Sequence, residues 1–89
     1  MAKTVEEVRA KLTAIIVEQL GVADSECTLE ANFETDLGCD SLDEVELVMA
    51  VEESFNIEVP DEQLDQVRTV GAAIAYVHSK LHDKAATRK

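Results

Sequence analysis

Apolar side chains recur at helical spacing in the first part of the chain, between Thr4 and Gly21. Thr4 and Glu7 fit a capping box, in which each side chain bonds the backbone of the other residue. Gly21 readily adopts the left-handed conformation that ends helices. The pattern therefore predicts a first helix over residues 5–20. The apolar positions that define it are Val5, Val8, Leu12, Ile15, Ile16 and Leu20.

The same spacing returns in the second half of the chain and predicts a helix over residues 41–55. A short helical segment of about 61–67 follows Pro60, and a last helix of about 70–81 is capped by Thr69. Residues 22–40 show no sustained period. A connection of this length in a small domain is often functional. We expect Cys27, Phe33 and Leu37 to pin it to the core and Gly38 to turn it tightly.

Strand alternation is absent, so the fold class is predicted to be all-α, a small helical bundle of three longer helices and one short helix. The 89 residues form one domain, 1–89. Its core is expected at about 4–81. The polar, basic tail 82–89 is expected to fray.

The helix over 41–55 carries two apolar stripes. One consists of Leu47, Val48, Val51 and Phe55, and the other of Leu42, Val45 and Met49. Spacing alone favours burial of both stripes, because a wide apolar arc usually faces the core. Acidic residues flank the second stripe, namely Glu46, Glu52 and Glu53.

Acidic residues dominate the charge, with 19 Asp and Glu against 8 Lys and Arg and a net charge of −11. No Lys or Arg lies between Lys11 and Arg68, a segment that holds 16 acids. This distribution argues against nucleic acid and anionic membrane as partners. It favours partners with basic surfaces, although the charge could also serve solubility alone. No stretch approaches the roughly 20 apolar residues of a membrane span. The N-terminus leads straight into a helix and leaves no room for a signal peptide, so we expect a cytoplasmic monomer.

Ser41 marks the point where the long loop meets a helix. With Glu44 it fits an ordinary capping box, in which Ser41 is the N-cap. A serine without an adjacent base is a poor nucleophile, and His78 and His82 lie far along the chain, so Ser-His catalysis is not expected. Cys27 and Cys39 form no metal pattern and are expected to be reduced thiols.

The wider run, from Asp36 through Leu37-Gly38-Cys39-Asp40-Ser41-Leu42-Asp43 to Ala50, closely resembles the acyl carrier proteins of dissociated (type II) fatty acid synthesis. The resemblance continues through Phe55, Val59-Pro60-Asp61-Glu62, Thr69-Val70, Ala72-Ala73-Ile74 and Tyr76, and covers about residues 4–80. Two departures are Cys39, where the family usually has Ala, and Leu64, where a small residue is common.

The resemblance implies a carrier and not an enzyme. A phosphopantetheinyl transferase would attach phosphopantetheine from coenzyme A to Ser41, and fatty acyl groups would ride on the arm as thioesters. The resemblance also favours the second stripe as a docking face for fatty acid synthesis enzymes with basic patches. That face would consist of Asp40, Leu42, Val45, Glu46, Met49, Glu52 and Glu53. The positions that match the family's acyl-chain cavity are Val48, Val51, Val59, Leu64, Val67, Ala73 and Tyr76.

Two alternatives stay open. A carrier of this kind could serve polyketide, peptide or specialised-lipid assembly, although its free-standing length and its Val-Glu-Leu-Val-Met run favour fatty acid synthesis. An acidic protein could instead bind divalent cations. A calcium loop started at Asp36 would place Gly38, Ser41 and Leu47 where an oxygen ligand, a glycine and a glutamate are needed, so no dedicated metal site is expected.

Overall fold

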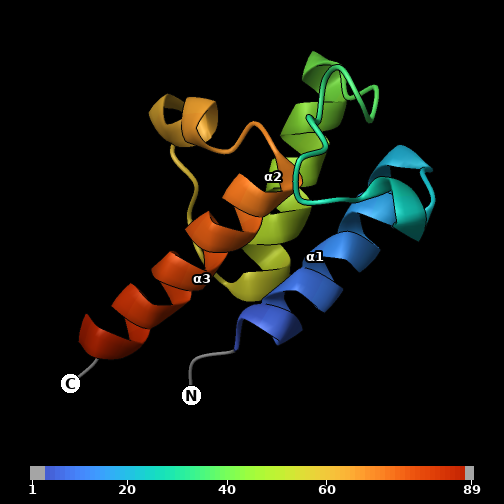
Figure 1. Cartoon of the computed structure of the whole chain (residues 1–89). Coiled ribbons are helices and arrows are strands. Elements are labelled where there is room, and N and C mark those ends of the chain that lie inside the picture. Colours follow the sequence, from blue (N-terminus) through green and yellow to red (C-terminus); the bar gives the residue numbers. More distant parts are fainter. Residues whose placement is uncertain (1–3, 88–89) are drawn as a thin grey trace.

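The computed structural model describes residues 4–87, with the side chains of residues 4–82. It confirms the all-α prediction: three long helices pack together and short 3₁₀ turns lie in the connections between them (Figure 1). The elements in chain order are α1 (Val5–Leu20), η1 (Asp24–Glu26), α2 (Ser41–Phe55), η2 (Asp61–Gln66) and α3 (Val70–Thr87).

Local sequence signals set most helix ends. The Thr4 hydroxyl accepts a hydrogen bond from the Glu7 N–H at 3.2 Å, and the Glu7 carboxylate accepts one from the Thr4 N–H at 3.1 Å. Gly21 follows α1 with φ +70°, a conformation that costs glycine little. Thr69 caps α3 through the Ala72 N–H at 3.2 Å. The predicted capping box and helix stop of α1 are confirmed.

The last helix is longer than its apolar stripe indicates. We expected α3 to end near residue 81, but it continues to Thr87. No Gly or Pro interrupts residues 82–87, and this stretch contains Lys and two Ala, which favour helix. The helix therefore includes most of the tail that was expected to fray. Residues 88 and 89 lie outside the described part.

One aliphatic core joins the three long helices. The deepest side chains are Leu12, Ile16, Val8 and Val70, each at most 2% exposed. The long connection contributes Cys27, Ala31 and Leu37 to the same cluster, and Phe33 packs against it half-buried. The sequence analysis predicts these core contacts for Cys27, Phe33 and Leu37 but not for Ala31.

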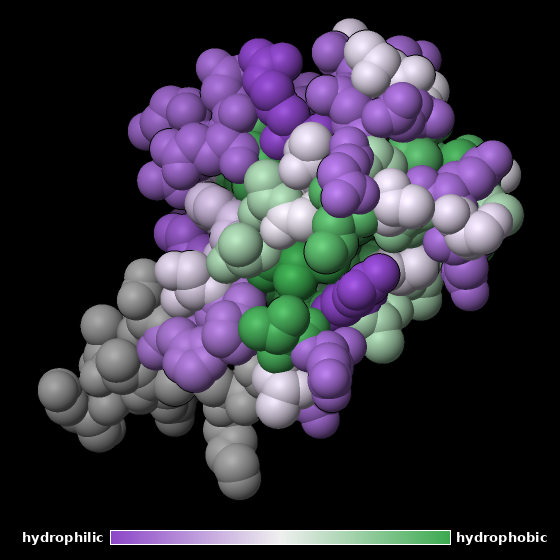
Figure 2. Space-filling model, in the orientation of Figure 1, coloured by the Kyte–Doolittle hydropathy of each residue, from purple (hydrophilic) through white to green (hydrophobic). Residues whose placement is uncertain are grey.

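The connection also lies against the start of α3. The Phe33 N–H donates to the Arg68 carbonyl at 3.0 Å, and the Gly71 N–H donates to the Leu29 carbonyl at 2.9 Å. A Cβ on Gly71 would lie only 3.0 Å from that Leu29 oxygen, so this close approach favours glycine. The contacts hold the loop in place where it turns toward α2. Figure 2 shows that polar residues cover most of this face of the molecule and that hydrophobic surface is exposed between them near its centre.

Candidate functional site

Ser41 lies where the long connection turns into α2. The turn depends on Gly38, whose φ is +71°, and on a hydrogen bond from the Cys39 N–H to the Phe33 carbonyl at 2.8 Å. Ser41 is the first residue of α2 and is exposed to solvent. The loop therefore presents this hydroxyl at the helix N-terminus, where backbone N–H groups and the helix dipole favour an anion.

The N-cap of α2 is Asp40, and the prediction that Ser41 caps the helix is wrong. The Asp40 carboxylate accepts a hydrogen bond from the Asp43 N–H at 2.9 Å, and the Asp43 carboxylate accepts one from the Asp40 N–H at 3.4 Å. The capping box is thus shifted by one residue from the one expected with Glu44. Among the described residues, none hydrogen-bonds the Ser41 hydroxyl, which leaves it available for chemistry.

The second apolar stripe of α2 faces solvent. Leu42, Val45 and Met49 are 67%, 55% and 59% exposed, so burial, which spacing alone favoured, is wrong. Val48 lies half-buried beside the stripe, and Leu47 faces the core. The exposed stripe begins one residue after Ser41 and continues along the same helix.

The acids around the stripe are not equivalent. Glu46 and Glu53 are exposed. Glu52 is half-buried, and its carboxylate accepts a hydrogen bond from the Val59 N–H at 2.8 Å. Glu52 therefore holds the segment before η2 against α2, a structural task that the sequence did not reveal.

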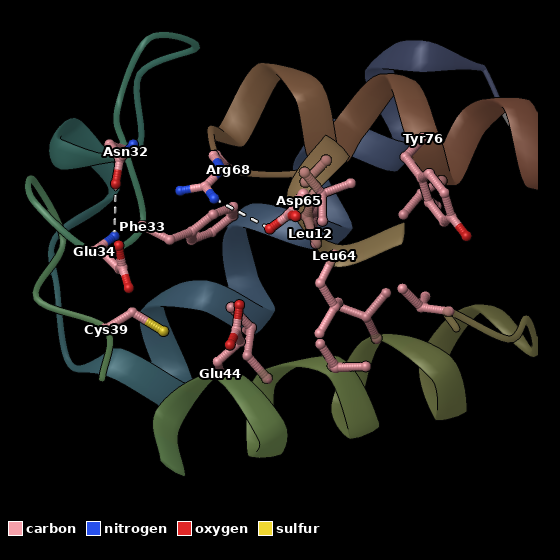
Figure 3. A pocket seen from close by; sticks show the side chains of 17 residues that line it. Leu12, Asn32, Phe33, Glu34, Cys39, Glu44, Leu64, Asp65, Arg68 and Tyr76 are labelled. Carbon is pink, nitrogen blue, oxygen red and sulfur yellow. Dashed lines mark hydrogen bonds and ion pairs between the residues drawn. The ribbon is translucent and has the colours of Figure 1, made fainter. Parts of the chain in front are cut away.

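A cavity of about 220 Å³ opens between α2, η2 and α3 (Figure 3). All seven positions that match the family's cavity line it: Val48, Val51, Val59, Leu64, Val67, Ala73 and Tyr76. Cys39 and Glu34 lie at one end of the cavity and Tyr76 at the other (Figure 3). The Tyr76 hydroxyl donates a hydrogen bond to the Gln63 side-chain oxygen, which ties η2 to α3 at that end.

Sequence reasoning missed the polar residues along this cavity. Glu34, Glu44, Asp65 and Arg68 also line it, and Arg68 forms an exposed ion pair with Asp65 at 3.1 Å. Arg68 had one visible signal: it is the first basic residue after 56 positions without one, from 12 to 67. Its place beside the cavity follows from the backbone pairing near Phe33, a long-range contact that no local pattern indicates.

Cys39 lies between the loop and the cavity and is 6% exposed. Its Sγ lies 3.6 Å from the Asp40 carbonyl oxygen, as a weak donor. Burial, followed by the negative charges of Asp43 and Glu44 and then of Asp40 and Glu34, raises the pKa of the Cys39 thiol to about 11. The thiol therefore stays protonated at neutral pH.

The described residues contain no group of three or more His, Cys, Asp and Glu side chains placed to hold a metal ion. Within that same part of the chain, no helix combines the length and the apolar character that crossing a membrane requires.

Comparison with known proteins agrees with this geometry. Residues 10–77 match the family model described as the phosphopantetheine attachment site. The chain is 50% identical over 76 residues to an acyl carrier protein of Guillardia theta, an alignment that spans 85% of this chain and 94% of the relative. It is 49% identical over 75 residues to an acyl carrier protein of Prochlorococcus marinus (strain MIT 9515), covering 84% and 94% of the two chains. The chain belongs to the acyl carrier protein family.

A solved structure supports the same assignment. The acyl carrier protein of Enterococcus faecalis superposes with a TM-score of 0.75 at 35% sequence identity, covering 88% of this chain and 99% of that one. An acyl carrier protein holds its cargo on a phosphopantetheine group and shuttles it between enzymes, and is itself a carrier and not an enzyme. Family membership implies interaction with a phosphopantetheinyl transferase and with synthesis enzymes.

Proposed function

We propose that Ser41 carries the phosphopantetheine arm and that the chain shuttles fatty acyl groups between the enzymes of dissociated fatty acid synthesis. The observation that carries this proposal is the exposed hydroxyl of Ser41, without a hydrogen-bond partner among the described residues, at the N-terminus of α2. Because Asp40 caps the helix, Ser41 has no capping role to lose on modification. The residue fits phosphopantetheine, since attachment through a phosphodiester needs only one accessible hydroxyl on the protein.

The bound arm supplies a thiol that holds the acyl group as a thioester. The chain's own residues present the Ser41 oxygen, and the backbone N–H groups of the first turn of α2 favour the negative charge attached there. Asp40 and Asp43 cap the same turn and offer that charge no cationic clamp. The arm is therefore free to project toward a partner, and tethering raises the effective concentration of its cargo at each docked enzyme.

We assign the docking face to Leu42, Val45 and Met49, with Asp40, Glu46 and Glu53 around them. An exposed apolar strip bordered by acids suits a partner surface with an apolar pocket inside a basic rim. Glu52 belongs to this face only at its edge, because its carboxylate is engaged by the Val59 backbone. We also propose a cytoplasmic monomer; the high negative charge supports the monomeric state, because like-charged copies repel one another.

The cavity beside α2 is the proposed resting place of the acyl chain. Its predominantly aliphatic lining would shield the chain from water, and each buried methylene contributes about 0.8 kcal/mol. Acylated protein should therefore melt at a higher temperature than the same protein with a bare arm. Equal melting temperatures for the two forms would show that the chain stays outside.

The attachment site is tested with Ser41→Ala. Ser54→Ala is the matched control, because Ser54 is exposed on the same helix but lies near its C-terminal end. After treatment with coenzyme A and a phosphopantetheinyl transferase, the intact mass of the Ser54 variant should rise by one phosphopantetheine, while that of the Ser41 variant should not change. A modified Ser41→Ala protein would disprove the assignment.

Folding of the Ser41 variant should be almost unaffected. The hydroxyl makes no hydrogen bond with the described residues, and Ala is the best helix former, so the free energy of unfolding should change by no more than about 0.5 kcal/mol. Circular dichroism melts of both variants check this point. They also separate a lost attachment site from a lost fold.

A further inference from the structure

Two histidines lie one turn apart on α3, away from the site described above. The Nε2 atoms of His78 and His82 are 3.0 Å apart, and their ring centroids are separated by 4.2 Å with the rings tilted by 57°. His82 is exposed and His78 half-buried, so the pair is open to solvent on one side. Neither side chain has a part in the proposed carrier function.

We propose that His78 and His82 form a bidentate site for a late first-row divalent transition-metal ion, of which Ni²⁺ and Cu²⁺ have the fitting geometry. Imidazole nitrogens are good ligands for these ions. Two histidines at positions i and i+4 of a helix lie on one face and can share a metal, as in zinc-binding helices. In the metal-free protein one ring nitrogen donates a hydrogen bond to the other, which holds both Nε2 atoms on the same side.

The distance between the two nitrogens, which is also that of a hydrogen bond, is close to the ligand spacing of certain metals. With metal–nitrogen bonds of about 2.0–2.1 Å, the separation of 3.0 Å corresponds to an N–metal–N angle of roughly 91–97°. Square-planar and octahedral ions place neighbouring ligands near this angle, and square-planar or tetragonal geometry is typical of Cu²⁺ and Ni²⁺. A tetrahedral ion such as Zn²⁺ would need the nitrogens farther apart, at about 3.3 Å.

The surrounding helix keeps the pair in position. Val77, next to His78, is 2% exposed in the core, and Leu81, next to His82, packs against that core partly buried. These contacts fix the rotation of α3 and thus the helix face from which both histidines project. Because no third His, Cys, Asp or Glu among the described residues completes the group, water would occupy the remaining coordination positions.

The site is independent of the carrier function. The pair begins at the middle of α3, a helix whose C-terminal end points away from the start of α2 (Figure 1). Metal binding there should leave modification of Ser41 unchanged. The proposal therefore goes beyond the proposed function and stands or falls separately from it.

Titration calorimetry with Ni²⁺ on the full chain without an affinity tag tests the proposal. A large excess of Mg²⁺ occupies the carboxylates, which prefer hard cations, and leaves the imidazoles free. The sharpest variant is Ser79→His combined with His82→Ala, because it keeps two histidines but moves them to adjacent positions on different sides of the helix. Ser79→Ala is its matched control, since Ser79 is exposed.

We expect one Ni²⁺ per chain in the native protein and in Ser79→Ala. Affinity should fall by at least about tenfold in His82→Ala and in the double variant, because one ligand then leaves the chelate. The histidine ring signals in NMR spectra should respond to Ni²⁺ in the native protein. Equal Ni²⁺ affinity in the native protein and the double variant, or no binding to the native protein, would overturn the proposal.

Discussion

The thiol of Cys39 stands two residues from the proposed attachment point and is almost completely buried. A carrier that presents a reactive thiol on its arm benefits when its own cysteine thiols stay protonated and unreactive, because only the thiolate attacks electrophiles. Burial and four neighbouring carboxylates raise the pKa of Cys39 to about 11, above its ordinary value of 9.0. Burial, with Asp24 and Glu26, also raises the pKa of Cys27.

Cys39 should therefore resist alkylation in the folded protein. With the pKa raised by two units, the thiolate fraction near pH 8 is about 100-fold lower than in an ordinary thiol. The rate of modification by iodoacetamide should keep rising by about tenfold per pH unit up to roughly pH 11, whereas a free thiol levels off near 8.5–9. Mass spectrometry of peptides from a timed reaction measures this rate.

The same protein in urea provides the control for the alkylation experiment, because unfolding exposes both cysteines. Fast labelling of Cys39 at pH 8 in the folded state would contradict the pKa shift. Slow labelling that persists in urea would show that burial is not its cause.

The residues around Ser41 show what local sequence can and cannot decide. The run Asp40-Ser41-Leu42 predicts the attachment point, but it fits a capping box at either of two registers. Asp40 with Asp43 forms the cap instead of Ser41 with Glu44. The backbone distinguishes the two registers, because Asp40 is extended, with ψ −176°, whereas Ser41 already belongs to the helix. The hydrogen bond between Glu52 and the Val59 N–H could not be predicted either, because no short-range rule couples positions seven residues apart.

On the scale of a single element, α2 divides its apolar residues between two tasks. Leu47, Val51 and Phe55 face the core, each at most 8% exposed. Val45 and Met49 remain exposed on the stripe. The helix bounds follow from periodicity, but exposure of the stripe does not, because spacing cannot tell which apolar face finds a partner within the chain.

The stripe makes a prediction about docking. Met49→Ala should weaken binding to partner enzymes by up to about 1.5–3 kcal/mol, the value of burying such a side chain, with little dependence on salt. Since Met49 is 59% exposed, the melting temperature should barely change. Val5→Ala on α1 is the matched control, because Val5 is 49% exposed and far along the chain from Ser41. A large loss of stability with unchanged transfer kinetics would mean that Met49 serves the fold.

The acids on α2 should act on the rate of association. Charge reversal by Glu46→Lys together with Glu53→Lys should slow modification by the transferase, most strongly at low salt, because exposed charges steer the encounter. Glu6→Lys together with Glu18→Lys reverses two exposed acids on α1 and controls for the same change in net charge. Stopped-flow kinetics at several salt concentrations separate the two cases. An equal effect of the α1 double variant would show that total charge, and not this face, guides the partner.

On the scale of the whole molecule, attraction between opposite charges contributes little to the fold. The ion pair of Arg68 with Asp65 has both side chains more than 60% exposed, and such pairs contribute only about 0–1 kcal/mol. The core of the described residues contains no buried polar or charged side chain. Aliphatic packing therefore holds the chain together while its surface acids repel one another. Helical periodicity predicted the bundle, whereas the pairing of the long loop with α3 depends on contacts distant in sequence.

The repulsion predicts that salt stabilises the protein. The 16 acids of residues 12–67 face no basic side chain within that segment, so screening relieves more repulsion than it costs in attraction. Raising NaCl from very low concentration to about physiological strength shortens the Debye length to about 8 Å. A gain of about 1 kcal/mol would raise the melting temperature by about 4–8 °C for a domain of this size.

Neutralisation by mutation should replace part of the effect of salt. Glu46→Gln with Glu53→Gln removes two exposed negative charges without reversing them. The variant should melt at a higher temperature than the native protein at low salt and gain less from added NaCl, because less repulsion remains to be screened. Mg²⁺ should stabilise the native protein at lower concentration than Na⁺, since carboxylates bind this hard divalent cation directly. Differential scanning calorimetry measures the melting temperatures of both proteins. A melting temperature that stays constant or falls as NaCl is added would show that repulsion between the surface acids does not destabilise the fold.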